Sequence, residues 1–213
     1  MKKIILPDHQ HIYPFNEPAR DLRIQNKPLW LIHRDLLAPY VSEEIDLPEG
    51  SDLPSVQGPA IVYRDNLYFD QPYIDEFLER AQQRDVPSRA AFSEQDAAFR
   101  EHALPLSNSY QKQGDNYLAD LWYYPSTSTI GQDAEPLLVD LQASEVGYYH
   151  VPTYMASDQG DLVFQVPLRS MIAIDSWVHV FIADVVFGLY TRGVRFEARL
   201  DRDIFFKLGV LSK

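Results

Sequence analysis

Cysteine is absent from this chain of 213 residues. Its absence excludes disulfides, thiolate nucleophiles, iron–sulfur clusters and cysteine-ligated zinc sites. An excess of basic residues is also missing, because the formal net charge at pH 7 is −12. A chain this acidic repels the nucleic-acid backbone, so we expect no nucleic-acid partner.

Glycine-rich phosphate loops are missing as well. The nine glycines are dispersed, and neither G-x-x-x-x-G-K-[ST] nor G-x-G-x-x-G occurs. The G-x-S-x-G pattern of a nucleophile elbow is also absent. Any phosphate-binding site must therefore depend on side chains.

Long apolar runs are scarce. The first residues, MKKIILPDHQ, contain too short an apolar stretch for a signal peptide. Residues 171–190 form the single membrane candidate, but Asp175, His179 and Asp184 interrupt it. Each central Asp costs roughly 2.5–3.5 kcal/mol on insertion scales. We therefore predict a buried strand followed by a helix there, a cytoplasmic protein and no membrane partner.

The first half of the chain alternates between strand and helix patterns. The patterns predict strands at 2–6, 60–64 and 88–92, helices at 28–41, after Asp70 and at 94–103, and a surface loop at 42–58. Asp70 is placed to cap its helix, and Ser93 to Asp96 match a capping box. This alternation predicts an α/β fold with three layers, α-β-α, around a mixed, mainly parallel sheet.

The second half contains more strand-like runs. They lie at 117–124, 137–142, 146–151, 161–167 and 170–174, and a helix is predicted at 176–190. A last helix carries an apolar stripe of Phe196, Leu200, Ile204, Leu208 and Leu211. We therefore divide the chain into an α/β domain at 1–192 and a C-terminal amphipathic helix at 193–213, which could connect to a further domain.

The strongest candidate site follows the strand at 60–64. Arg64-Asp65-Asn66 stands at its carboxyl end, where open α/β sheets place ligand and metal chemistry. Asp65 could hold Mg²⁺, which binds one or two carboxylates plus substrate phosphates. The alternative is a strand-end turn in which Asp65 accepts backbone hydrogen bonds.

Basic residues gather shortly after the first strand. Arg20, Arg23 and Lys27 could clamp a triphosphate, because guanidinium groups offer a fork of donors to phosphate. They could equally form a solvated basic turn. His9 and His11 lack the third ligand that zinc needs, so we interpret them as loop residues.

Asp184 lies in an apolar helical context, where a carboxylate is costly to bury unless it is paired, liganded or protonated. It could be a second metal ligand that meets Asp65 in the fold. A salt bridge to Arg192 or Arg195, or exposure on the other face of the helix, would explain it as well.

Three segments resemble a known family. A Phe, Glu-Pro, Leu and Arg pattern fits Phe15, Glu17 or Pro18, Leu22 and Arg23, a strand-Asp-turn-helix fits Ile61 to Phe77, and a tryptophan-led helix fits Trp177 to Asp184. These segments resemble divergent sugar nucleotidyltransferases similar to the N-terminal domain of bifunctional N-acetylglucosamine-1-phosphate uridyltransferases. The hexapeptide repeats that often follow in such proteins are not visible here.

The resemblance implies an enzyme with a Rossmann-like nucleotidyltransferase domain that contributes to cell-envelope biosynthesis. It would transfer a nucleoside monophosphate from a nucleoside triphosphate to a sugar 1-phosphate and release pyrophosphate. Asp65 and Arg23 would be catalytic, Arg20, Arg23 and Lys27 would bind the nucleotide, and Asp65 and Asp184 would hold Mg²⁺. The alternative is a non-catalytic sugar-nucleotide-binding or docking domain of a larger hexapeptide-repeat protein, homo-oligomeric through that missing domain.

Overall fold

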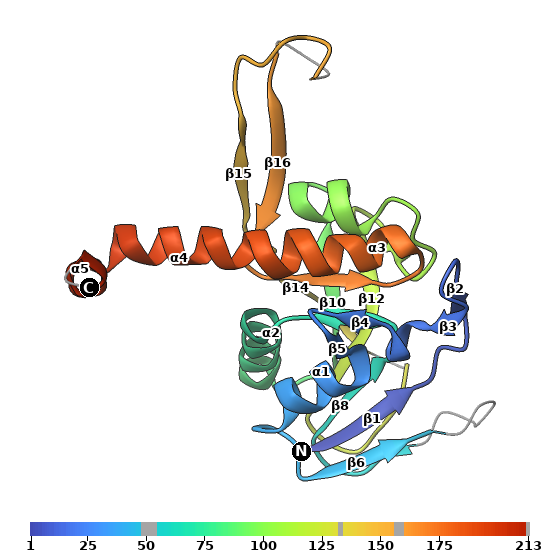
Figure 1. Ribbon diagram of the computed structural model, residues 1–213. Helices are drawn as coiled ribbons and strands as arrows, with labels where there is room; N and C mark the ends of the chain where they lie inside the picture. The colour runs from blue at the N-terminus through green and yellow to red at the C-terminus, as the bar shows by residue number, and fades with distance from the viewer. Residues whose placement is uncertain (48–54, 132–133, 156–159, 212–213) are drawn as a thin grey trace.

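The computed structural model describes residues 1–47, 55–131, 134–155 and 160–211 (Figure 1). Its centre is a seven-stranded sheet. The strand order is β14 (Glu135–Leu138), β10 (Ser88–Ser93), β12 (Asn116–Tyr124), β8 (Ala60–Arg64), β1 (Lys2–Leu6) and β6 (Glu43–Asp46), with β11 (Gln111–Gln113) paired to β12. Only β12 runs against its neighbours β8 and β10, while the other pairs along this order are parallel. The predicted mixed, mainly parallel α/β class is confirmed.

The central strands form where the sequence predicts them. β1 and β8 are almost entirely buried, as expected of apolar strands paired on both sides. The edge strand β6 was not predicted, because 42–58 was interpreted as a surface loop. Three of its four residues are acidic, and charges of this kind are common on exposed edge strands. Residues 48–54 of that loop lie outside the described residues, and Ser55–Val56 form a second short strand, β7.

The helix after β8 follows its sequence signals closely. In α2 (Gln71–Arg84) the side chain of Asp70 accepts a hydrogen bond from the backbone N–H of Tyr73, and Pro72 stands in the first turn. The predicted apolar face is buried, namely Tyr73, Ile74, Phe77, Leu78 and Ala81. The earlier helix α1 (Leu29–Leu37) begins at the predicted point, directly after Pro28, and ends four residues before Val41.

The helix predicted at 94–103 begins later than expected. Helical residues start at 97 and continue into the π-helical segment η2 (Phe99–Ala103). Its cap is Asp96, whose side chain accepts from the N–H of Phe99, whereas the side chain of Ser93 accepts from the N–H of Gln95. The capping-box interpretation therefore placed the start of the helix too early.

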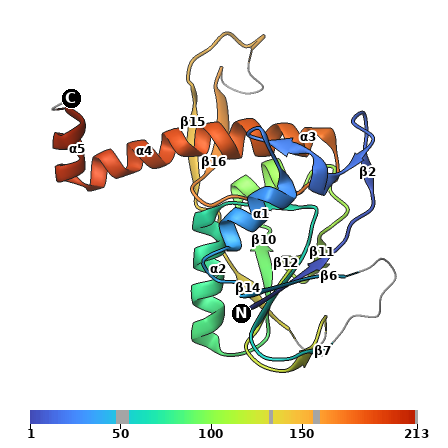
Figure 2. The same ribbon diagram turned by 60° about the horizontal axis from the view of Figure 1, so that its bottom comes forward.

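The two faces of the sheet are covered differently. The larger core cluster joins one face to residues of α1, α2, η2 and the C-terminal helices. The smaller cluster, on the other face, contains Val56 and Ile130 and has no helical residue in the part of the chain that the structure describes. The short ribbon of β7 (Ser55–Val56) and β13 (Ser128–Thr129) lies there (Figure 2). The third layer expected to be helical is thus built from a ribbon and loops.

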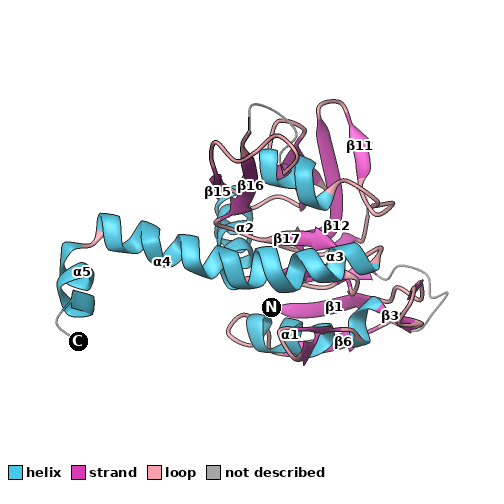
Figure 3. Ribbon diagram, turned by 45° about the horizontal axis from the view of Figure 1, so that its top comes forward, coloured by secondary structure: helices cyan, strands magenta, loops and turns pink. Residues whose placement is uncertain are grey.

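The C-terminal region forms one long helix followed by a short one. α3 (Trp177–Phe181), π-helical η3 (Ile182–Tyr190) and α4 (Thr191–Arg202) are continuous, and α5 (Ile204–Leu211) follows. α4 projects away from the sheet (Figure 3). The two helices predicted at 176–190 and 193–213 therefore differ from those observed, and the predicted boundary at 192/193 lies within the long helix. The division into two domains stays a prediction.

By length and composition, the helix Trp177–Arg202 could cross a membrane, although 39% of its apolar window is buried in the fold. Core helices pass the same test, so this is weak support for a span. The preceding strand, β17 (Met171–Ala173), is buried and pairs with β9 (Leu67–Phe69). The predicted strand followed by a helix is therefore confirmed, and the expected absence of a membrane partner stays a prediction.

Small hairpins complete the fold. β15 (Ala143–Tyr148) and β16 (Leu162–Pro167) form a ribbon that projects from the body (Figure 1). Between β1 and α1 lie the pair β2 (His11–Ile12) and β3 (Glu17–Pro18), the one-turn helix η1 (Ala19–Asp21), and the pair β4 (Arg23–Ile24) and β5 (Lys27–Pro28). These last elements place the predicted basic residues.

Candidate functional site

The topology marks one position at the carboxyl edge of the sheet. β1 and β8 are adjacent and parallel, with Leu6 paired to Arg64 at their carboxyl ends. The chain leaves β1 through α1 toward β6 on one side, and leaves β8 through α2 toward β10 on the other. Ligands of open α/β sheets bind outside the strand ends at such a topological switch point. Asp65 follows β8 directly, and Asp8 follows β1 after Pro7.

Asp65 is buried between the two strand-end loops. Its backbone N–H donates to the carbonyl oxygen of Leu6 at 3.0 Å. Its carboxylate accepts from the N–H of Asp8 at 2.7 Å and from Nη1 of Arg20 at 3.1 Å. Burial raises the pKa of Asp65 to about 6, although the Asp8 N–H and the Arg20 charge act in the opposite direction. The structure thus joins two of the predicted site residues, Asp65 and Arg20.

The other predicted residues have different surroundings. Arg23 is exposed on β4, and the exposed Lys27 forms an ion pair with Asp35 at 3.1 Å. Asp184 accepts from the backbone N–H of Gln25 at 2.6 Å. Asp184 therefore holds the turn of the β4–β5 hairpin against the long helix, whereas Asp65 binds the loop after β1.

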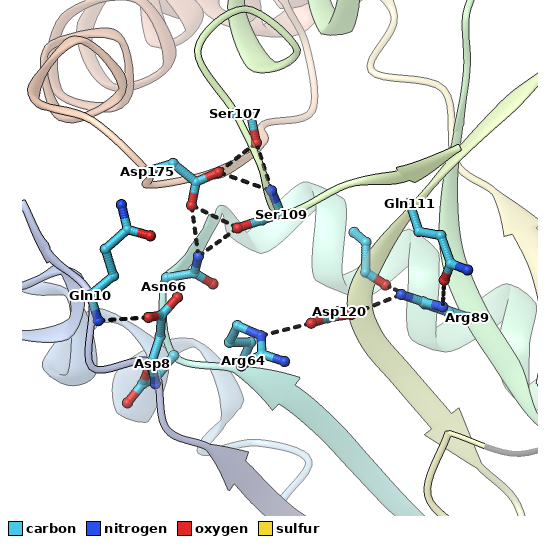
Figure 4. A network of polar contacts seen from close by, with 12 residues as sticks. Asp8, Gln10, Arg64, Asn66, Arg89, Ser107, Ser109, Gln111, Asp120 and Asp175 are labelled. Atoms are coloured by element: carbon cyan, nitrogen blue, oxygen red, sulfur yellow. Dashed lines mark hydrogen bonds and ion pairs between the residues drawn. The ribbon is translucent and has the colours of Figure 1, made fainter. Parts of the chain in front are cut away.

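A second polar cluster, which includes Asn66 directly after Asp65 in the sequence, was not predicted (Figure 4). Asp175 follows β17 and accepts five hydrogen bonds from Asn66, Ser107, Asn108 and Ser109. Asn66 donates through Nδ2 to both Asp175 and Ser109, while its Oδ1 is buried without a partner among the described residues. The cluster fixes the 107–109 loop against the end of β8 and leaves one acceptor unused.

An ion-pair ladder crosses the sheet next to this cluster. Asp120 on β12 accepts from Nε of Arg64 at 2.7 Å and from Nη2 of Arg89 at 2.8 Å. The guanidinium of Arg89 also lies 4.9 Å from the ring centroid of Trp122, which belongs to the face without helices. A carboxylate shared in this way orients both arginines, and Arg64 is the more exposed of the two.

Some of these residues carried a signal in the sequence. Arg64 and Asn66 flank Asp65 at the end of the same strand. Assigning the site to all three consecutive residues would therefore have included them. Asp175 precedes the helix-capping Ser176, but its partners at 107–109 are more than sixty residues away. No local pattern connects such positions.

The metal predictions can be compared with the described side chains. No group of three or more His, Asp or Glu side chains placed to hold a metal occurs among them. His9 and His11, interpreted as loop residues, are exposed and belong to no such group in the described ranges. A metal ion at the strand ends would therefore need ligands from a bound substrate.

Comparisons with known proteins give limited information. No protein-family model matches the chain, and no curated protein sequence matches it significantly. A structure described as a glucose-1-phosphate thymidylyltransferase from Bacillus anthracis in complex with a sucrose is 12% identical, covering 58% of this chain and 70% of that one, with a TM-score of 0.35. HddC from Yersinia pseudotuberculosis complexed with GMP-PN is 11% identical, covering 85% and 96%, with a TM-score of 0.43. Neither structure is similar enough to assign a function to this chain.

Proposed function

We propose that this chain transfers a nucleoside monophosphate from a nucleoside triphosphate to a sugar 1-phosphate in the cytoplasm. The observation that supports it is the position of Asp65 at the β1/β8 switch point, bonded to Arg20 and to the loop after β1. Open α/β sheets bind ligands at this position. A carboxylate there can bind a cation, and the neighbouring guanidinium can bind the phosphates of a substrate.

In the proposed reaction a phosphate oxygen of the sugar 1-phosphate attacks the α-phosphorus of the triphosphate. The new P–O bond forms as the bond to the β-phosphate bridging oxygen breaks, and pyrophosphate leaves with that electron pair. Catalysis of this kind depends on positioning and on neutralising charge. We assign neutralisation of the phosphates to Arg20 and Arg23, with Lys27 as a further nucleotide-binding residue.

Asp65 and Asp8 are the residues suited to hold Mg²⁺. Mg²⁺ commonly binds one or two protein carboxylates and takes its other ligands from phosphates and water, so it does not require a larger cluster. Asp8 is half-buried, and its charge opposes ionisation of Asp65, an effect that a bound cation would relieve. The ion would supply charge stabilisation for the phosphates.

Asp184, proposed earlier as the second metal ligand, has a positioning role that its contact supports better. Its hydrogen bond to the N–H of Gln25 holds the β4–β5 hairpin, which carries Arg23 and Lys27. We therefore propose that Asp184 acts on the nucleotide only through these two cations.

The test is release of pyrophosphate from UTP or GTP with a panel of sugar 1-phosphates and Mg²⁺. We expect turnover in the wild type and a loss of at least about a hundredfold in Asp65→Asn, because the carboxylate acts on developing charge. Asp46→Asn is the matched control, since Asp46 lies 3.6 Å from the same Arg20 but is half exposed at the edge of the sheet. Equal rates in wild type and Asp65→Asn would refute the proposal.

A non-catalytic sugar-nucleotide-binding or docking domain is the second candidate. It is favoured by the loop after β1, where residues 7–10 contain no glycine to bring backbone donors close to a phosphate. Calorimetry distinguishes the two functions. Nucleotide binding without pyrophosphate release in any combination would support the binding domain.

A further inference from the structure

A cavity of about 410 Å³ lies away from the strand-end site. Its walls come from the β4–β5 hairpin, α1, the start of α2, and the η3–α4 part of the long helix. Asp65, Arg20 and Arg23 do not line it, and Lys27 is the one predicted nucleotide-binding residue that does. Its volume is within the usual range for small-molecule sites, about 300–1,000 Å³.

The charged side chains that line the cavity have a positive net charge, whereas the net charge of the whole chain is negative. Lys27, Arg192 and Arg195 line it, against Asp35 and Asp70. Lys27 pairs with Asp35 and Arg195 with Asp70, while Arg192 bonds to the neutral side chain of Gln25. The lining thus has one unmatched positive charge in a chain whose net charge is −12, which favours a ligand with a single negative charge.

Tyr68 offers a polar group to the cavity. Its side chain is buried, with 5% of the residue exposed, and it lines the cavity. Its hydroxyl makes no hydrogen bond to any residue that the structure describes. Asp70, Arg195 and Arg192 are the charged groups that act most strongly on it, and all three line the cavity. The hydroxyl is not among the fully buried side-chain atoms that lack a partner, so it is open to the cavity and can bond to a molecule there.

The remaining lining is apolar. Ile32 and Leu36 are partly exposed and offer apolar surface to a ligand, whereas Phe69, Phe187 and Ile24 are buried and present almost none. Gly188 brings the helix close to the hairpin, because a Cβ there would meet the side-chain amide of Gln25. Small-molecule sites combine mostly apolar walls with a few placed polar groups in this way.

We infer that this cavity binds a small organic anion that carries one negative charge, as a carboxylate or a phosphodiester, beside an apolar group. The anionic group lies by Arg192 and the Tyr68 hydroxyl, and the apolar group lies against Ile32 and Leu36. The site shares Lys27 with the residues proposed to bind the nucleotide, but Asp65, Arg20 and Arg23 do not line it. Its ligand would connect the hairpin to the long helix.

The test is isothermal titration calorimetry of the full chain with two anions, naphthoate and cyclic AMP. The neutral molecules naphthamide and adenosine serve as their comparators. We expect one of the anions to bind once per chain, about tenfold or more tighter than its comparator, because a charge-assisted contact is lost in the neutral molecule. The naphthoate and cyclic AMP arms separate a carboxylate ligand from a phosphodiester. No binding by either anion, or equal binding by the neutral comparator, would overturn the inference.

Four variants test whether the anion binds in the cavity. Tyr68→Phe should weaken binding about three- to tenfold, because one hydrogen bond is lost, and Tyr117→Phe, outside the cavity, should not. Gly188→Leu should block binding, because a side chain there displaces the amide of Gln25 that bonds to Arg192. The Asp65→Asn variant should bind the anion as tightly as the wild type does, which distinguishes this site from the transferase site. Unchanged binding in Tyr68→Phe, or loss in Asp65→Asn, would refute the assignment.

Discussion

Replacing Asp65 by asparagine should change how the stability of the protein depends on pH. Burial between the loops after β1 and β8 raises the pKa of this carboxyl from its ordinary 3.8 to about 6. The folded protein therefore holds the proton more tightly than the unfolded chain does. Asparagine has a similar shape and does not titrate, so the substitution removes this effect while keeping an acceptor for the Asp8 N–H.

The sign and size follow from proton linkage. A raised pKa stabilises the fold below the ordinary pKa, and that stability is lost as pH rises through the folded pKa. A rise of about two pH units corresponds to about 3 kcal/mol. Relative to wild type, Asp65→Asn should therefore gain about 3 kcal/mol in free energy of unfolding between about pH 3.5 and about pH 7.5.

Urea denaturation followed by tryptophan fluorescence at several pH values measures this difference. Val62→Ala serves as control, because it removes buried apolar atoms from the same strand and carries no titrating group. It should lower the free energy of unfolding by a constant amount at every pH. If Asp65→Asn and wild type give parallel profiles, the carboxyl is not held in the environment described, and the reasoning fails.

Three further outcomes are expected. Asp175→Ala should destabilise the fold by more than about 3 kcal/mol in urea denaturation, because five hydrogen bonds lose their acceptor; a loss below about 1 kcal/mol would contradict the network. Asp70→Ala should cost about 1–3 kcal/mol by the same assay, because it removes the α2 cap and the partner of Arg195, and an unchanged midpoint would count against both contacts. Backbone amides of the projecting β15–β16 ribbon should exchange with deuterium faster than those of buried β8, because few buried contacts protect the ribbon; equal protection would show that another element covers it.

The parts of the fold that were predicted correctly depend on local physical signals. β1 and β8 are short apolar runs that end at a proline or at charged residues. α2 has a capping Asp70, a first-turn proline and an apolar face, which are all read from neighbouring positions. Such signals operate over a few residues and need no knowledge of the rest of the chain.

The parts that were missed depend on distant contacts. β6 is too acidic to resemble a strand, and it forms because β1 offers a free edge. Asp184 meets Gln25 across 159 positions of sequence, so its partner could not be identified from its helical neighbours. The prediction for Asp65 was more informative because the carboxyl end of a parallel strand has a fixed place in the sheet.

The π-helical segment η3 sets the rotational phase of the outer half of the long helix. In an α-helix each residue advances the chain by about 100° around the axis, whereas a π-helical turn accommodates one more residue. Side chains of α4, such as Phe196, therefore point in a direction that the wide turns at 182–190 determine. Deleting a single residue from those turns would rotate every side chain beyond them by about a quarter of a circle relative to α3.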